Sequence, residues 1–269
     1  MKTGPMLTIL LFIILCYLLL CALAFLWQTR LIFPRTTAED AAYAQYAGQH
    51  IALAGEDALL SGWQLEDPAA DNALIILYFG GNAEDVISLL PILQKMGARH
   101  TYAFNYRGYG RSEGTPSQAA LYADAEAIYD ELGRRHNLDT AQVVVIGRSL
   151  GSAVAGYLAT QRRVDKLVLL TPLKSAIQNG KRMFPILPVT WLLQHPFELI
   201  TYAEQFTCPV LMLVGDADVV IPPKDSLATY AAINSPKELL ELPGVGHNNL
   251  FDNPNALKAI RDFVLRRAQ

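Results

Sequence analysis

The feature that most limits the possible folds of this chain is an alternation of short apolar runs with helical stretches. Several runs are continuous in Val, Ile and Leu, as in parallel strands that are covered on both faces. The strand candidates are His50–Ala54, Leu59–Leu65, Ala73–Phe79, His100–Tyr106, Gln142–Ile146, Lys166–Leu170, Val210–Val214 and Glu238–Leu242. The helix candidates are Glu84–Met96, Ser117–Arg135, Ser152–Gln161, Lys224–Ala232 and Asn255–Arg267. This order predicts an α/β fold with a doubly wound sheet.

One segment interrupts the alternation. Residues 171–206 follow a strand candidate and run about 35 residues before the next one, well beyond ordinary loop lengths. The segment contains four prolines and an apolar group made of Met183, Phe184, Ile186, Leu187, Val189, Trp191, Leu192 and Leu193. We expect a cap insertion of short helices. Its two interpretations are an extra packing layer and a cover over an active-site mouth.

An uncharged apolar run extends from Leu7 to Trp27, with Thr8 as its one clearly polar side chain. A helix of about 21 residues spans roughly 31 Å, which matches the hydrocarbon core of a bilayer. We therefore expect residues 1–27 to form a membrane anchor helix. Residues 28–50 are then a tether that packs on a domain formed by residues 51–269.

Cleavage and orientation of this segment stay open at the sequence level. Ala22-Leu23-Ala24 resembles a signal-peptide cleavage site, but the apolar run continues past it, which favours an uncleaved anchor. Arg30 and Arg35 after the run, against Lys2 before it, favour a cytoplasmic domain, whereas a first signal-anchor usually inserts with its N-terminus inside. We expect a single-pass membrane protein, with a slight preference for an extracytoplasmic domain.

Charge and cysteine content exclude some classes of protein. Lys and Arg number 22 against 25 Asp and Glu, a net charge of −3, so the chain lacks the cationic surface of a nucleic-acid-binding protein. Cys16 and Cys21 lie inside the apolar run and leave Cys208 alone in the remainder. No disulfide within the domain is therefore predicted. The sequence does not predict the oligomeric state.

The strongest chemical signal is the segment Val143–Ala153, in which an apolar strand candidate leads through Gly147-Arg148-Ser149-Leu150-Gly151 into a helix candidate. Glycine on both sides of a serine permits a sharp turn that presents the serine hydroxyl at the edge of a sheet. The N-terminus of the helix directs free N–H groups at the same point. We predict that Ser149 is a nucleophile.

A nucleophilic serine needs a base and an acid that orients the base. His247 ends a glycine-containing loop after the last strand candidate, whereas the other four histidines lie at positions that favour structural roles. Asp216 and Asp218 both follow the strand candidate Val210–Val214, at the sheet edge where open α/β folds place their sites. We predict the order Ser149, Asp218, His247, with Asp216 as the alternative acid.

An oxyanion hole requires backbone N–H donors beside the serine. Leu150, directly after the nucleophile, is one expected donor, and Asn82 in the loop Phe79-Gly80-Gly81-Asn82-Ala83 is the other. We expect Phe79 and Gly81 from this loop, and Phe184 and Trp191 from the cap, to contact the substrate.

Other site types are disfavoured by spacing. The glycines in Phe79–Ala83 and in Arg107–Gly114 do not have the spacing of a complete dinucleotide-binding or phosphate-binding motif. The segment Arg107–Gly114 is instead interpreted as a tight turn at a strand end, with Arg107 packed or paired nearby. No His/Cys cluster has zinc-ligand spacing and no acidic motif resembles a calcium loop, so we predict neither a metal nor a cofactor.

From about Ile51 to Gln269 the chain resembles the α/β-hydrolase superfamily. Phe79–Ala83, Asn105–Ser112, Gly147–Gly151 and Gly246-His247, together with Leu31–Pro34 after the apolar run, resemble its membrane-anchored α/β-hydrolase-domain group. The resemblance implies an eight-stranded, mostly parallel sheet with an antiparallel second strand, and a Ser149–Asp218–His247 triad. It also implies hydrolysis of an ester, thioester or amide. The family commonly has His where this chain has Gly80.

The sequence therefore predicts a membrane-anchored serine hydrolase that cleaves an ester or thioester through an acyl-enzyme. The apolar cap and the membrane anchor favour a small-molecule or lipid-like acyl substrate. A membrane-bound serine peptidase or amidase is the enzymatic alternative. A catalytically silent binding scaffold on the same fold is the alternative of another class.

Overall fold

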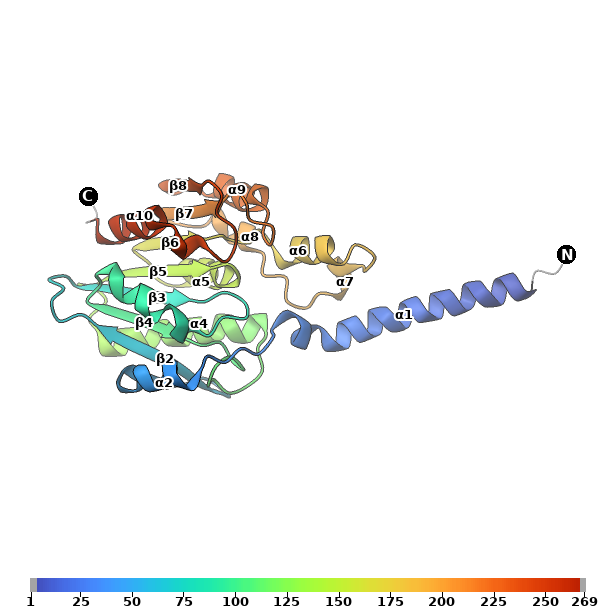
Figure 1. Ribbon diagram of the computed structural model, residues 1–269, viewed down its shortest axis with the longest axis horizontal. Helices are drawn as coiled ribbons and strands as arrows, with labels where there is room; N and C mark the ends of the chain where they lie inside the picture. Colours follow the sequence, from blue (N-terminus) through green and yellow to red (C-terminus); the bar gives the residue numbers. More distant parts are fainter. Residues whose placement is uncertain (1–3, 267–269) are drawn as a thin grey trace.

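An eight-stranded sheet forms the centre of the computed structural model, which describes residues 4–266. The strand order is β1-β2-β4-β3-β5-β6-β7-β8. β2 is antiparallel to both of its neighbours, and the remaining pairs from β4 to β8 are parallel (Figure 1). The strands are β1 His50–Ala54, β2 Leu59–Glu66, β3 Leu74–Phe79, β4 His100–Phe104, β5 Gln142–Arg148, β6 Lys166–Leu170, β7 Val210–Gly215 and β8 Lys237–Leu242. The predicted mostly parallel sheet is therefore confirmed.

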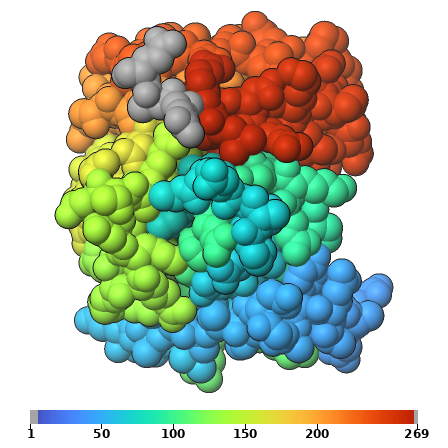
Figure 2. Space-filling model, turned by 90° about the vertical axis from the view of Figure 1, so that its left-hand side faces the viewer, coloured from blue at the N-terminus to red at the C-terminus, as the bar shows by residue number. Residues whose placement is uncertain are grey.

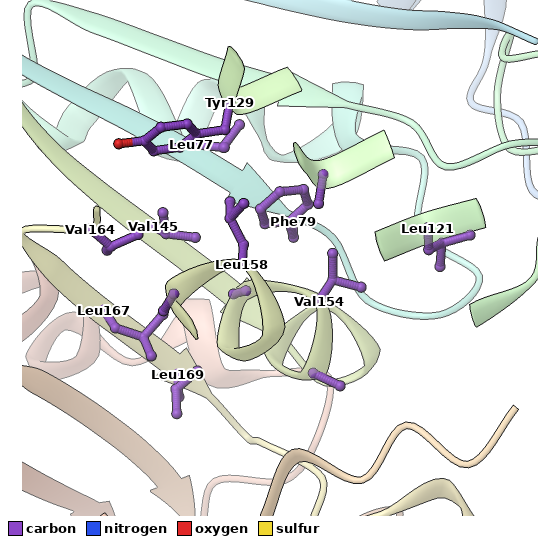
Figure 3. Packing of buried hydrophobic residues seen from close by; sticks show 14 of the residues in the cluster. Leu77, Phe79, Leu121, Tyr129, Val145, Val154, Leu158, Val164, Leu167 and Leu169 are labelled. Atoms are coloured by element: carbon purple, nitrogen blue, oxygen red, sulfur yellow. The ribbon is translucent and has the colours of Figure 1, made fainter. Parts of the chain in front are cut away.

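The central strands are buried because helices cover both faces of the sheet. Neighbouring residues of β3 enter different hydrophobic clusters, Leu77 on one face and Ile76 on the other. Figure 3 shows Leu77, Val145 and Leu167 from three strands beside Leu158 of a covering helix. Burial on both faces is the physical reason why these strands read as unbroken apolar runs in the sequence.

The helices are divided between the two faces. α4, α5 and α8 supply apolar side chains to the cluster that contains Leu77, whereas α3 and α10 supply the cluster that contains Ile76. The helices of the sheet domain and cap are α2 Asp40–Gln45, α3 Leu90–Leu93, α4 Gln118–Arg135, α5 Leu150–Gln161, α6 Ala176–Met183, α7 Val189–Leu192, α8 Leu199–Ala203, α9 Pro223–Ala232 and α10 Pro254–Leu265.

The helix predicted at Glu84–Met96 is broken into three pieces. Four residues of α-helix, α3, lie between the 3₁₀ turns Val86–Leu89 and Gln94–Met96. Pro91 at the start of α3 lacks the N–H that a continuous helix would need at this point. The side chain of Asp85 accepts the N–H of Ile87 and begins the first turn separately. The apolar periodicity is thus present without one continuous helix.

The segment after β4 forms the tight turn that was predicted there. Gly108, Gly110 and Gly114 have φ values of 74°, 50° and 81°, which favour glycine. Arg107 is buried inside the turn and donates from Nε and Nη2 to the two carboxylate oxygens of buried Asp124, both at 2.8 Å. The pair fixes the turn to α4, and its charge-assisted bonds hold the Arg107 pKa above its usual value.

Removing one partner of this buried pair is expected to destabilise the domain strongly. The Asp124→Ala variant leaves the Arg107 charge inside the protein without its main partner, and we expect the free energy of unfolding to fall by about 3–5 kcal/mol. Urea unfolding of the detergent-solubilised protein measures this change. Glu131→Ala is the control on the same helix, because its ion pairs with Arg134 and Arg135 lie at the surface and such pairs contribute about 0–1 kcal/mol. Equal losses in the two variants would contradict the expectation.

α1, Gly4–Ile32, projects away from the sheet domain (Figure 1). Within residues 4–266 it is the one helix long and apolar enough to cross a membrane, with Met6–Ile32 as its candidate span. The helix continues past Trp27, so the first part of the predicted tether is helical. Buried Gln28 explains this extension, because its side chain accepts the Gln194 N–H at 2.7 Å and donates to Leu192 O at 2.9 Å.

The segment predicted as a cap divides into two parts. α8 belongs to the helical layer on the sheet, since Leu199 and Ala203 are fully buried. α7, which packs against α6, lies beside α1 instead (Figure 1). Tyr17 of α1 donates a hydrogen bond to Ile186 O in the loop between α6 and α7, at 2.8 Å. α7 and the loop before it are therefore attached to α1 as well as to the domain.

Candidate active site

Ser149 occupies a strained turn between β5 and α5. It has φ 51° and ψ −115°, and residues other than glycine rarely adopt a positive φ of this kind. A Cβ at Gly147 would lie 2.3 Å from Gly151 O, and one at Gly151 would lie 2.2 Å from Phe79 O. Both flanking glycines are thus required by the close packing of strand and helix, and the turn holds Ser149 at the carboxyl end of β5.

Two loops bring an imidazole and a carboxylate to this serine. His247, after β8, has Nε2 at 3.0 Å from Ser149 Oγ. Its Nδ1 lies 2.8 Å from Oδ2 of Asp218, which follows β7. Because a carboxylate accepts hydrogen bonds, Nδ1 carries the proton, and Nε2 is left as the acceptor for the Ser149 hydroxyl. The three predicted residues therefore form one continuous chain of hydrogen bonds.

Asp218 is fixed by its own backbone. Its Oδ1 accepts the N–H groups of Val220 and Ile221 at 2.9 and 2.8 Å, which leaves Oδ2 directed at His247. Asp216, the alternative acid, is exposed and accepts the Gly244 N–H at 2.7 Å instead. The geometry favours Asp218 as the partner of the imidazole, while Asp216 ties together the two loops that carry the site.

The loop after β3 lies beside the nucleophile. A Cβ at Gly81 would sit 3.6 Å from Ser149 Cβ, so the loop backbone approaches the serine closely. The Leu150 N–H is in the first turn of α5, where backbone donors have no partner within the helix. Across residues 4–266, neither the Leu150 N–H nor the Asn82 N–H donates a hydrogen bond. Both predicted donors are thus free to bind an oxyanion.

A buried ion pair under this loop was missed by the sequence analysis. Arg148 Nη1 donates to Glu84 Oε2 at 2.5 Å, and the same carboxylate oxygen accepts the Gly81 N–H at 3.1 Å. Arg148 also donates through Nη2 to His247 O at 3.3 Å. Tyr78 donates its hydroxyl to the other Glu84 oxygen at 2.7 Å, and burial raises the Tyr78 pKa well above its usual value. This network connects the loop, the nucleophile turn and the His247 loop.

Loss of the Glu84 charge is expected to slow turnover more than substrate binding. In the Glu84→Gln variant the ion pair with Arg148 is lost. The loop after β3 and the His247 loop are then no longer fixed relative to each other through Arg148. We expect kcat to fall about 10- to 100-fold with little change in KM, since small displacements of reacting groups have effects of this size. Steady-state kinetics of ester hydrolysis measures kcat and KM separately. Glu126→Gln, which removes a carboxylate paired with Arg162 on α4, is the matched control and should leave kcat unchanged.

The Asn82 side chain has a second, structural connection. Its Nδ2 donates to Ile32 O at the end of α1 at 2.7 Å, and its Oδ1 accepts the Tyr109 hydroxyl at 2.5 Å. The loop beside Ser149 is therefore bound directly to the C-terminus of the apolar helix. Gly80 stands where the family that this chain resembles commonly has His. Space is limited at this position, since a Cβ there would lie 3.0 Å from both Glu84 Oε1 and Val86 Cγ1.

The four residues predicted to contact substrate lie in different environments. Gly81 is next to Ser149. Phe79 is the last residue of a covered strand, so its side chain packs in the core, as Figure 3 shows. Phe184 and Trp191 are 50% and 86% exposed on the cap. Across the described part of the chain, no group of three or more His, Cys, Asp or Glu side chains is placed to hold a metal ion.

Comparison with known proteins identifies the family. A family model described as the alpha/beta hydrolase fold matches residues 74–194. The chain is 35% identical over 254 residues to an uncharacterized protein of Mycobacterium tuberculosis (strain ATCC 25618 / H37Rv), covering 91% of this chain and 90% of that protein. It is 30% identical over 192 residues to the alpha/beta hydrolase domain-containing protein 17B of Xenopus laevis, covering 70% and 65%. The chain belongs to the α/β-hydrolase family.

Solved structures agree with this assignment. An esterase of Pyrococcus furiosus aligns with a TM-score of 0.69 at 18% identity, covering 87% of this α/β-hydrolase and 97% of the esterase. Est1E from Butyrivibrio proteoclasticus, solved with ferulic acid bound, aligns with a TM-score of 0.64 at 16% identity, covering 80% and 98%. These likenesses show the fold, which is the α/β-hydrolase fold that the sequence predicted. Family and fold together support a hydrolase.

Proposed function

We propose that this α/β-hydrolase is a membrane-anchored serine hydrolase that cleaves the ester or thioester bond of a lipophilic acyl substrate. The observation that carries the proposal is the hydrogen-bonded chain from Ser149 Oγ through His247 to Asp218, at 3.0 and 2.8 Å. It lies beside two backbone donors that have no other partner among the described residues. A nucleophile, a base and an anion-binding pair in this arrangement suit acyl transfer.

The reaction follows from the roles that these atoms can take. His247 Nε2 accepts the Ser149 proton as Oγ bonds to the substrate carbonyl carbon, and Asp218 stabilises the imidazolium that forms. The carbonyl oxygen becomes an oxyanion and accepts the Leu150 and Asn82 N–H groups. His247 then returns the proton to the leaving alcohol or thiol, which leaves an acyl-enzyme on Ser149. Water, deprotonated by His247, releases the acid and regenerates the serine.

The membrane part of the proposal rests on α1 and the cap. The candidate span of α1 has a mean hydropathy of 3.2 and no buried residues in its most apolar window, so its side chains are available to lipid. The segment from α6 to α7 contacts α1 through α7 and Ile186, and it exposes large apolar side chains at Met183, Phe184, Ile186 and Trp191. An exposed apolar patch beside a membrane helix is typical of contact with a bilayer. Substrates that are themselves lipid-like would reach Ser149 from this side.

A panel of acyl substrates tests the substrate class. We expect kcat/KM for p-nitrophenyl esters and matched thioesters to rise at least about 10-fold from C2 to C8, because each buried CH₂ contributes about 0.8 kcal/mol and burial of about two of the added groups gives this factor. Aminoacyl p-nitroanilides should be hydrolysed far more slowly. Faster cleavage of the anilides would make the protein a peptidase, and no turnover of any substrate would favour a silent scaffold. The full chain in detergent micelles is used throughout.

A further inference from the structure

A hollow outside the triad lies where α1 meets the sheet domain. It is an open pocket of about 700 Å³, lined by the last turns of α1, by Phe33 and Arg35 after it, and by Thr115 and Pro116 from the segment before α4. Ser149 and His247 do not line it. The mechanism above does not use this pocket, so its lining needs a separate explanation.

The pocket has one apolar end and one cationic end. Leu26 and Trp27, 71% and 56% exposed, lie toward the N-terminal side, and Arg30 and Arg35 follow in the chain. Within residues 4–266, neither arginine forms an ion pair with a carboxylate, whereas the Arg107 and Arg148 guanidinium groups do. Two guanidinium groups without a partner at one hollow suit a bidentate anion, phosphate above all.

The height of the pocket along α1 matches the polar surface of a bilayer. Arg30 is near the domain end of the candidate span Met6–Ile32. At about 1.5 Å rise per residue it lies roughly 4–5 Å beyond Trp27, and tryptophan side chains concentrate at the level of lipid headgroups. An anion held here is therefore at the depth of lipid phosphates, with apolar side chains on the bilayer side of it.

We propose that this pocket binds the headgroup of an anionic phospholipid. The phosphate lies between Arg30 and Arg35, the Thr115 hydroxyl is available to the headgroup, and the start of the acyl chains packs on Leu26 and Trp27. The inference rests on the membrane anchoring proposed above and not on the hydrolytic activity. It commits to a lipid rather than free phosphate because only a lipid uses both ends of the pocket.

Binding at this place fastens α1 to the domain. Phe33, in the pocket wall, is buried and packs against the rings of His195 and Phe197. The neighbouring Ile32 carbonyl accepts the Asn82 side chain from the loop beside Ser149. A lipid that bridges Arg30 and Arg35 links the helix end to the segment after it, so it stabilises this junction. The bound lipid should therefore raise the thermal midpoint of the full chain.

The test uses the full-length protein in a non-ionic detergent, titrated with palmitoyl-oleoyl phosphatidylglycerol, the matching phosphatidylcholine, or inorganic phosphate. Native mass spectrometry counts bound lipid, and thermal unfolding reports stabilisation. We expect wild type to retain phosphatidylglycerol in preference to phosphatidylcholine and to be stabilised by it. The Arg30→Gln/Arg35→Gln variant should lose at least about 10-fold in phosphatidylglycerol affinity, as loss of charge-assisted bonds implies.

Control variants distinguish lipid binding at Arg30 and Arg35 from a general effect of surface charge and from catalytic activity. Arg134→Gln/Arg261→Gln removes two exposed arginines from α4 and α10 and should bind like wild type. α10 lies at the end of the molecule opposite α1 (Figure 1) and is seen in red on the face shown in Figure 2. Ser149→Ala should also bind like wild type, whatever its activity. Equal retention of both lipids, unchanged binding in the Arg30/Arg35 variant, or equal competition by inorganic phosphate would overturn the proposal. An intact mass that lacks α1 would overturn the anchoring with it, whereas failure with α1 present leaves the anchoring standing.

Discussion

The Ser149→Ala variant is expected to lose fluorophosphonate labelling completely and to lose about 10⁴-fold or more in kcat on any ester that the wild type hydrolyses. The physical reason is that Oγ is the atom 3.0 Å from His247 Nε2, and among the described residues no other hydroxyl forms a hydrogen bond with this imidazole. Without Oγ the remaining backbone donors still bind the carbonyl oxygen, so a small residual rate over solution is compatible with the proposal.

A neighbouring serine supplies the control for this experiment. Ser152, one turn along α5, is fully buried and donates its hydroxyl to Ser149 O at 2.5 Å. The Ser152→Ala variant should still react with the fluorophosphonate, because the Ser152 hydroxyl bonds to the backbone and not to His247. An unlabelled wild type, or a Ser149→Ala variant labelled as strongly as wild type, would end the catalytic assignment. Circular dichroism of both variants checks that each has folded.

The parts of the fold that the sequence predicted best are those whose environment is uniform. β3, β5, β6 and β7 are covered on both faces, so their composition alone identified them. The nucleophile turn was also predictable, because the strained φ of Ser149 and the close approach at Gly151 demand a local pattern that is visible in a few residues. Asp218 and His247 followed from their positions after successive strands.

Interactions between distant segments could not be predicted in this way. Glu84 and Arg148 are far apart in the chain, and each is unremarkable in its own window, yet they meet under the site. The bond from Asn82 to the end of α1 depends on how the helix leaves the domain, which no local pattern encodes. The apolar periodicity of Glu84–Met96 favours one continuous helix, but Pro91 interrupts it. Tertiary contact decides such features, and local preference is a weak guide to them.

Asp218 and Asp216 lie on the same loop after β7, and a second large effect on kcat is expected from only one of them, Asp218. We expect Asp218→Asn to lower kcat by about 10⁴-fold, because an amide in this place can present an N–H to Nδ1 and so favour the wrong imidazole tautomer. Asp218 is also fixed by the Val220 and Ile221 N–H groups, so the change of charge acts on a side chain that has little freedom to turn away. Steady-state hydrolysis and the rate of fluorophosphonate labelling should fall together.

Asp216→Asn is the matched change two residues away and should leave kcat within about twofold of wild type, as surface substitutions usually do. An asparagine oxygen can still accept the Gly244 N–H that Asp216 accepts at 2.7 Å, so the loop before His247 keeps its attachment. Because the two variants make the same chemical change on one loop, a general disturbance of that loop would slow both. A large loss in Asp216→Asn with little loss in Asp218→Asn would reverse the assignment of the acid and require His247 to change partner during the reaction.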